Sequence, residues 1–208
     1  MLKRTVAILS ALFLAFGILS ISVLRAASIE YSFSGSNGKV LGEVATAQIK
    51  IDYEYPYPGG VLPDHTLWPL KALRDRLWLI VTVNPGKKAE LLLLFADKRI
   101  AASKILFERD KAPLAFSTLT KAEKYLQAAA FKEKENRKKL DTKSFLTKLA
   151  KAALKHRLTI REILEIAPED AKPEIIKTEN YAKDTYKEAR DALNSLGMPV
   201  PENPFNGD

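Results

Sequence analysis

The chain has 208 residues, a net charge of +8 and no cysteine. This length suits one ordinary domain with attachments. The lack of cysteine excludes disulfides, thiolate metal sites and a cysteine-based redox function. Lys3, Arg4 and Arg25 contribute three of the positive charges, so residues 29–208 carry +5. That charge is spread over many Lys/Glu-rich segments and forms no single basic block.

The first 28 residues have the pattern of a membrane-targeting segment. Lys3 and Arg4 precede an uncharged, mostly apolar stretch over residues 5–24. As a helix this stretch would span about 30 Å, which matches a bilayer core. We therefore expect a signal anchor that contacts the lipid bilayer through residues 5–24 and leaves residues 29–208 extracytoplasmic. Small residues around Ser28 leave a cleaved, secreted form as the alternative.

Residues 29–60 are predicted to form an extended, Tyr/Pro-rich linker. Within it Ile49, Ile51, Tyr53 and Tyr55 alternate with polar residues, as is typical of a half-buried strand. No convincing second strand follows, and a lone two-stranded ribbon is marginal in water. We expect this stretch to lie extended against helices, and whether residues 47–55 form a strand stays open. An edge strand that recruits a partner is the alternative.

A helix entrance at residues 61–77 divides the linker from the helical body. Pro63 keeps Leu62 extended, Asp64 or Thr66 can cap the helix, and Pro69 falls in its first turn. One face of the helix is apolar, because four residues recur at helical spacing: Leu70, Leu73, Leu77 and Val81. Trp68 and Trp78, the two tryptophans of the chain, form a ligand platform or, as we favour, anchor the helix to its neighbours.

Two long helices follow and complete a hairpin domain over residues 61–140. Asn84 caps the first, with Pro85 at its first position, and it runs to about Arg109. Pro113 opens the second, which continues to about Phe131. Because only about three residues join these long helices, we expect them to be antiparallel.

Further helices over residues 141–197 are expected to pack on this hairpin. One begins at Asp141 or Thr142. Thr159 and Glu162 have the spacing of a capping box, which predicts a turn at residues 156–158 and a new helix from Ile160. The last helix spans about 171–196 and stops at Gly197. Residues 198–208 are predicted to be a disordered tail.

No catalytic, cofactor or metal residues are assigned from the sequence. His65 and His156 are far apart, and no histidine–glutamate metal spacing, glycine-rich phosphate loop or Gly-x-Ser-x-Gly motif occurs. The charged stretch over residues 132–139 contains Glu133 and Glu135, so we expect no nucleic-acid partner. Asp64 and His65 could form half of an acid/base site, but a helix cap with a polar neighbour is the more common role of such a pair.

The helix entrance resembles a motif of an uncharacterised bacterial family. The similarity lies in Leu62-Pro63-Asp64, Leu67-Trp68-Pro69-Leu70-Lys71, Asn84-Pro85, Ala89-Glu90-Leu91 and Phe95-Ala96-Asp97. Thr66 stands where the family pattern has proline, Trp68 where it has tyrosine and Asn84 where it has aspartate. The resemblance covers roughly residues 57–130. It implies a helical domain that follows a membrane segment, and it implies no activity.

Together these patterns predict an all-α protein, an antiparallel bundle of long helical hairpins behind a membrane-spanning or signal helix. We expect a non-enzymatic interaction or scaffold module whose partner is another envelope protein. Its candidate surface comprises Asp64, His65, Trp68, Arg74 and Arg76. The alternatives are a sensor of an envelope ligand or polymer, with a groove near Trp68, and an enzyme that uses Asp64 and His65.

Overall fold

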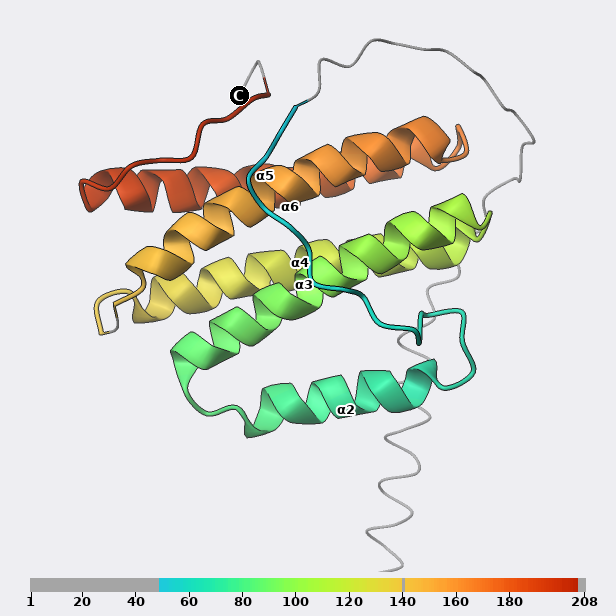
Figure 1. Ribbon diagram of the computed structural model, residues 1–208, viewed down its shortest axis with the longest axis horizontal. Helices are drawn as coiled ribbons and strands as arrows, with labels where there is room; N and C mark the ends of the chain where they lie inside the picture. Colours follow the sequence, from blue (N-terminus) through green and yellow to red (C-terminus); the bar gives the residue numbers. More distant parts are fainter. Residues whose placement is uncertain (1–48, 140, 206–208) are drawn as a thin grey trace, which may run out of the picture. The chain divides into compact units, whose positions relative to one another are not determined.

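The computed structural model describes residues 49–139 and 141–205 (Figure 1). This part of the chain contains five α-helices and no β-strand, which confirms the all-α prediction for it. The helices are α2 (Trp68–Val81), α3 (Pro85–Glu108), α4 (Ala112–Asn136), α5 (Lys143–Ile166) and α6 (Lys172–Ser195).

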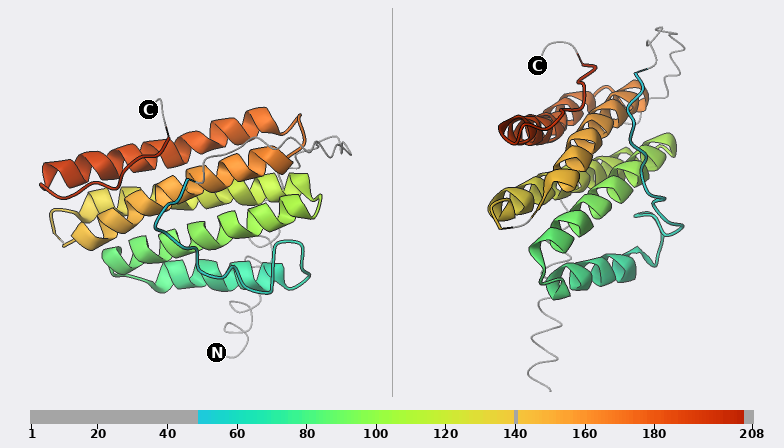
Figure 2. Two further views of the ribbon diagram at one scale, coloured as in Figure 1. Left: turned by 45° about the horizontal axis from the view of Figure 1, so that its top comes forward. Right: turned by 60° about the vertical axis from the view of Figure 1, so that its left-hand side comes forward.

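Four of these helices form two antiparallel hairpins that pack on each other (Figure 2). In one hairpin α3 packs along α4, and in the other α5 packs along α6. Between the hairpins α4 contacts α6 and α3 contacts α5. Helices α3 and α4 have 24 and 25 residues, so each is about 36 Å long. The antiparallel hairpin expected from the sequence is therefore present.

Local signals set several helix ends. The side chain of Asn84 accepts a hydrogen bond of 3.0 Å from the Lys87 amide and caps α3, and Pro85 occupies the first turn. Gly197 follows α6 with φ at +65°, a conformation that glycine adopts without a steric penalty. Neither Asp64 nor Thr66 caps α2, whose N-cap residue is Leu67 and has no side-chain cap.

The core combines alanines with larger aliphatic side chains. Alanine lets neighbouring helices approach closely, and leucine and isoleucine fill the space between them. Fully buried alanines occur in α3, α4, α5 and α6, at Ala96, Ala122, Ala129, Ala150, Ala153 and Ala182. The fully buried larger side chains include Ile100, Leu119, Leu126, Leu146, Ile160 and Ile175.

The described part of the linker crosses α3 and α5 (Figure 1). Ile49, Ile51 and Tyr53 pack against the core, whereas the residues between them are exposed. The Tyr53 hydroxyl donates to Asp97 of α3 at 2.6 Å, and the Tyr55 hydroxyl lies 3.0 Å from the hydroxyl of Thr159 in α5. The alternation in the sequence therefore reflects an extended segment with one side on helices, and no strand is present there.

Helix α5 is continuous through residues 156–158, so the turn expected there and a helix start at Ile160 are wrong. Both residues of the expected capping box have tertiary partners instead. Thr159 is buried beside the Tyr55 hydroxyl, and Glu162 pairs with Lys104 of α3 at 2.6 Å. With these side chains bound elsewhere and no glycine or proline in the segment, nothing interrupts the helix.

Disorder was expected over residues 198–208, but residues 198–205 pack on α5 and α6, and residues 206–208 lie outside the described residues. The Phe205 ring is buried, and the guanidinium groups of Arg157 and Arg161 lie 4.3 and 4.4 Å from its centroid. The Tyr186 hydroxyl donates a hydrogen bond of 2.8 Å to the carbonyl of Pro201. An apolar ring between two α5 arginines holds this segment in place.

The predicted anchor over residues 1–28 and the linker up to residue 48 lie outside the described residues. Within the described ranges, none of the helices combines the length and the apolar character that a bilayer crossing requires.

Candidate interaction surface

Helix α2 turns its apolar side away from the bundle. Its aliphatic side chains Leu70, Leu73, Leu77, Ile80 and Val81 form one stripe, which we term the outer face of α2, and their exposed fractions are 45–69%. Leu67 and Val83 are also exposed at the two ends of the helix. Asp75 is the one buried residue of α2. The amphipathic pattern is therefore present, but the described residues leave its apolar half uncovered.

The opposite side of α2 is attached to the protein by polar contacts and by its two tryptophans. The ammonium of Lys71 donates to the carbonyls of Pro58 and Val61 at 2.9 and 2.8 Å, and its burial lowers the pKa of this lysine. Trp78 meets Phe95 of α3 edge to face, with 6.2 Å between ring centroids. Among the described helices, α2 packs on α3 alone, and Figure 1 shows it beside α3 and outside the four-helix arrangement.

Trp68 covers a buried arginine. The Arg99 guanidinium lies 4.5 Å from the ring centroid of Tyr125, 5.7 Å from that of Phe95 and 5.9 Å from that of Trp68. Its Nε has no hydrogen-bond partner among the described residues, and burial lowers the pKa of Arg99. Lys71 also lies over Trp68, at 5.2 Å. Cations of the chain itself thus contact the Trp68 ring, which favours packing over a ligand platform.

Asp64 and His65 have separate contacts. Asp64 accepts from Lys111 at 2.7 Å and from Arg109 at 3.1 Å, and the hydrogen bond from Lys111 contributes most to lowering the pKa of this carboxyl. The exposed His65 uses Nδ1 to accept the Leu67 amide at 3.1 Å. Through these two ion pairs, Asp64 connects the segment before α2 to the α3–α4 connection.

Arg74 and Arg76 border the outer face of α2. Successive residues of a helix are rotated by about 100°, so these two arginines lie on opposite sides of the apolar stripe. Both are exposed, although Arg74 also pairs with Asp75 at 2.7 Å. Of the five surface residues expected from the sequence, Arg74 and Arg76 flank the outer face of α2, whereas Asp64 and Trp68 make contacts within the protein.

A buried polar cluster, which the sequence reasoning missed, joins α3, α4 and α5. Nδ1 of His156 lies 2.6 Å from a carboxylate oxygen of Glu123, and Nε2 lies 3.1 Å from one of Asp97. The second Asp97 oxygen accepts from Tyr53, and the Tyr55 ring packs edge-on against the imidazole. Burial alone would lower the pKa of His156, but the two carboxylates raise it to about 9. His156 is therefore a cation at neutral pH.

One signal in the sequence does point to this cluster. Asp97, Glu123 and His156 each fall at helical spacing among the apolar residues of three successive helices, where a charged group needs a partner. The cluster is closed to solvent, since all three residues are buried. In the parts of the chain that the structure describes, no group of three His, Cys, Asp or Glu residues is arranged to hold a metal ion.

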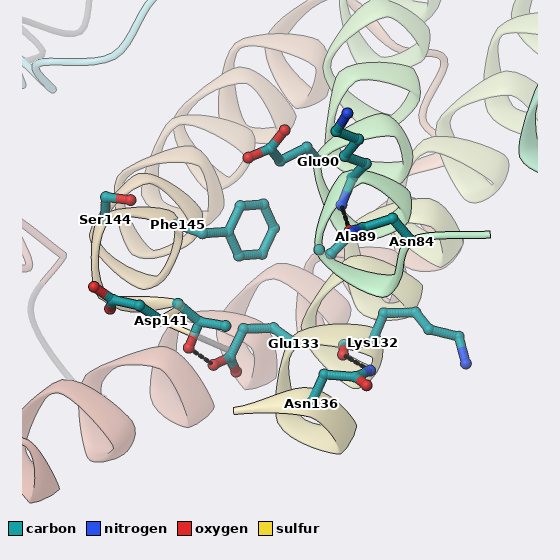
Figure 3. Close-up of a pocket in the computed structure, with 12 residues that line it drawn as sticks. Asn84, Ala89, Glu90, Lys132, Glu133, Asn136, Asp141, Ser144 and Phe145 are labelled. Carbon is teal, nitrogen blue, oxygen red and sulfur yellow. Dashed lines mark hydrogen bonds between the residues drawn. The ribbon is translucent and has the colours of Figure 1, made fainter. Parts of the chain in front are cut away.

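A pocket of about 230 Å³ lies where α3 begins, α4 ends and α5 begins (Figure 3). It is lined by Asn84, Glu90, Lys132, Glu133 and Phe145, among others. Its buried carboxylate, Glu133, is held by Arg137 at 2.6 Å and by the Thr142 hydroxyl at 2.7 Å. Neither His65 nor Trp68 lines this pocket, so it is not the groove that the sensor hypothesis requires.

Comparison with known proteins identifies a family without an assigned activity. The model described as Domain of unknown function (DUF5667) matches residues 60–170, more than half of the chain, from the entrance of α2 to the end of α5. The match agrees with the resemblance to an uncharacterised family seen in the sequence. Searches of curated proteins and of solved structures gave no match.

Proposed function

We propose that this chain, which belongs to the DUF5667 family, is a non-enzymatic interaction module held at the outer side of a membrane by residues 5–24. The observation that carries this proposal is the uncovered outer face of α2. The four-helix arrangement is the rigid support of the module, and α2 is the element that makes contact.

The exposed aliphatic stripe has an energetic cost for a domain that is free in water. Full burial of one leucine, isoleucine or valine side chain contributes about 1.5–3 kcal/mol. Five such side chains lie in one row on α2, and each is about half exposed or more. Contiguous apolar patches of this kind mark interaction sites. Burial of this face against a partner would therefore contribute several kcal/mol of favourable binding free energy, before the entropic cost of association is subtracted.

The sequence supports the membrane location. Residues 5–24 carry no charge and follow two basic residues, which is the pattern of an anchor with its N-terminus inside. Such an anchor restricts the module to the membrane surface, and its partners are then components of the envelope. The tether also raises the effective concentration of the module at that surface, so a weak contact suffices.

The contacts of Asp64 favour this function over an enzyme that uses Asp64 and His65. The contacts of Lys71 and Arg99 with the Trp68 ring favour it over a sensor with a ligand groove near Trp68. Asp64 pairs with Lys111 and Arg109, which suits a fastening contact more than an acid/base pair with His65. An enzyme that depends on the His65 imidazole would lose its activity in a His65→Ala variant, whereas an interaction module would keep its partner.

The absence of cysteine allows a sharp test of location and contact. Leu77 on α2 and Ile176 on α6 are matched sites, because they are 52% and 53% exposed. Full-length Leu77→Cys and Ile176→Cys variants would be treated in intact cells with a maleimide that cannot cross membranes. We expect labelling of Ile176→Cys and several-fold slower labelling of Leu77→Cys, with equal labelling of both after denaturation.

Two results would contradict the proposal, each in a different way. Labelling of both variants only after cell lysis would place the domain inside the cell and refute the membrane topology. Equal labelling of the two sites in intact cells would show that the outer face of α2 is free and would refute the contact.

A further inference from the structure

We propose that the occupant of the outer face of α2 is the surface of an anionic lipid bilayer, with α2 lying parallel to it. This inference rests on the proposed function, since the tether over residues 5–24 keeps α2 near a membrane. It goes further by naming the bilayer itself, and not another envelope protein, as the partner of α2.

The side chains of the outer face suit a hydrocarbon boundary. The stripe consists of leucine, isoleucine and valine alone, and it runs along a helix of 14 residues, which is about 21 Å long. Helices that lie in the membrane interface bury an apolar face by about 5–10 Å and keep their polar face away from the acyl chains. Lys71 is bonded to two backbone carbonyls on the bundle side, and the buried Asp75 is paired with Arg74, so docking of the stripe would leave neither of these charges without a partner.

The charges around the stripe complement anionic lipid headgroups. Between His65 and Ala89 the chain has five basic residues and a single acid, the buried Asp75. Arg74 and Arg76 flank the stripe on both sides. The Arg76 side chain can extend to the headgroups as the aliphatic residues enter the boundary, and Arg74 stays 64% exposed while it pairs with Asp75. Each basic residue near an anionic surface contributes about 1 kcal/mol. Of the acids that border this range, Asp64 is bound by Lys111 and Arg109, and Glu90 is exposed on α3.

Trp78 lies at the edge of the outer face and is half exposed. One side of its ring packs against Phe95, and the other side can lie among the lipid headgroups when α2 docks. Tryptophan is enriched at that level because its ring combines an apolar body with an N–H donor.

A bilayer suits this surface better than a second copy of the chain. In a symmetric dimer the same patch meets itself, so the Arg74 and Arg76 borders of one copy would oppose those of the other. Like charges across an interface oppose association. An anionic bilayer instead attracts all of these arginines at once.

The test uses the full chain in lipid nanodiscs and the same two cysteine positions. Leu77→Cys and Ile176→Cys would each carry an environment-sensitive fluorophore. The discs would consist of phosphatidylcholine, with or without phosphatidylglycerol. They would also contain lipids brominated near the headgroup end of the acyl chains, which quench a nearby fluorophore.

We expect a blue shift and strong quenching at position 77 in the anionic discs, and neither at position 176. Quenching at position 77 should fall several-fold without phosphatidylglycerol, at high salt, and in an Arg74→Gln/Arg76→Gln background. Arg76 is exposed, but Arg74 pairs with the buried Asp75, so circular dichroism of this background must match that of the unmodified chain before its quenching is compared.

Three outcomes would overturn the inference. Equal quenching at positions 77 and 176 in anionic discs would show that α2 does not dock on the bilayer. If the label at position 77 is unquenched but Leu77→Cys is protected from maleimide in cells, the partner of α2 is a protein. In that case the proposed function stands and this inference fails. A disulfide-linked dimer of unlabelled Leu77→Cys in discs, with the label unquenched, would identify a second copy.

Discussion

At the scale of single residues, His156 compensates the charge of two buried carboxylates. It lies between Glu123 and Asp97, which come from two other helices. As an imidazolium it can donate from both ring nitrogens, one to each carboxylate. When it loses its proton, only one nitrogen keeps a hydrogen, and one buried carboxylate loses a donor. One oxygen of Glu123 already has no hydrogen-bond partner among the described residues, so the cluster has no spare donor to replace it.

The raised pKa of His156 predicts that stability depends on pH in a defined window. The pKa is about 9 in the folded protein and 6.5 as the ordinary value, so the folded state binds the proton more tightly. This stabilisation is fully present below pH 6.5 and is lost as pH rises through about 9, by an amount on the order of 3 kcal/mol. Denaturant unfolding of the full chain between pH 6 and 10 measures it.

A His156→Gln variant should lose this pH dependence, and a His65→Ala variant should keep it, because His65 is exposed and outside the cluster. A free energy of unfolding that is constant from pH 6.5 to 9 in the unmodified chain would contradict a charged His156.

At the scale of elements, the segment after α6 behaves as part of the core. Phe205 is buried between Arg157 and Arg161, and Tyr186 binds the backbone at Pro201. We expect Phe205→Ala to cost about 3 kcal/mol in the free energy of unfolding, a value typical of a buried aromatic residue. Phe131→Ala is the control, because Phe131 is exposed, and it should cost less than about 1 kcal/mol. Equal small losses in both variants would show that the tail is not packed.

Helix α2 should contribute little to folding through its outer face. In nanodiscs of phosphatidylcholine alone, Leu77→Ala should change the free energy of unfolding by no more than about 0.5 kcal/mol. Leu149→Ala, at a buried position of α5, should cost about 2–5 kcal/mol because it leaves a cavity. A loss at Leu77 as large as that at Leu149 would mean that the fold of the domain itself buries the outer face of α2.

The sequence predicted elements whose signals are local and missed those that depend on distant partners. The cap at Asn84, the stop at Gly197 and the short α3–α4 connection act within a few residues, and all are present. The capping box at Thr159 and Glu162 was overridden by Tyr55 and Lys104, which are far away in the chain. The His156 cluster likewise joins residues 33 and 59 positions apart.

The orientation of α2 illustrates the same limit for the candidate site. Its apolar periodicity indicates one apolar face, but periodicity does not say what covers that face. The buried Asp75 and the bonds from Lys71 to Pro58 and Val61 decide which side meets the bundle. Arg74 and Arg76, which the sequence predicted for an interaction surface, flank the outer face of α2, whereas the aliphatic residues between them were not part of that prediction.

At the scale of the whole molecule, the family match over residues 60–170 spans α2, the α3–α4 hairpin and α5. The hairpin of α3 and α4 and the helix α5 form most of the core, and α2 rests on α3 from outside. Helix α6 lies beyond the matched range, yet it packs on α4 and α5 and contributes Tyr186 and Leu193 to the core.

The central claim is that the outer face of α2 is covered in the membrane-bound protein. The most direct measurement is a scan of single-cysteine variants of the full chain in its own membrane, at Leu70, Leu73, Leu77, Ile80, Arg74 and Arg76, with labelling rates normalised to the denatured chain. We predict slow labelling at the four aliphatic positions and fast labelling at the two arginine positions, so that protection recurs at helical spacing. Uniformly fast labelling along α2 would contradict the claim.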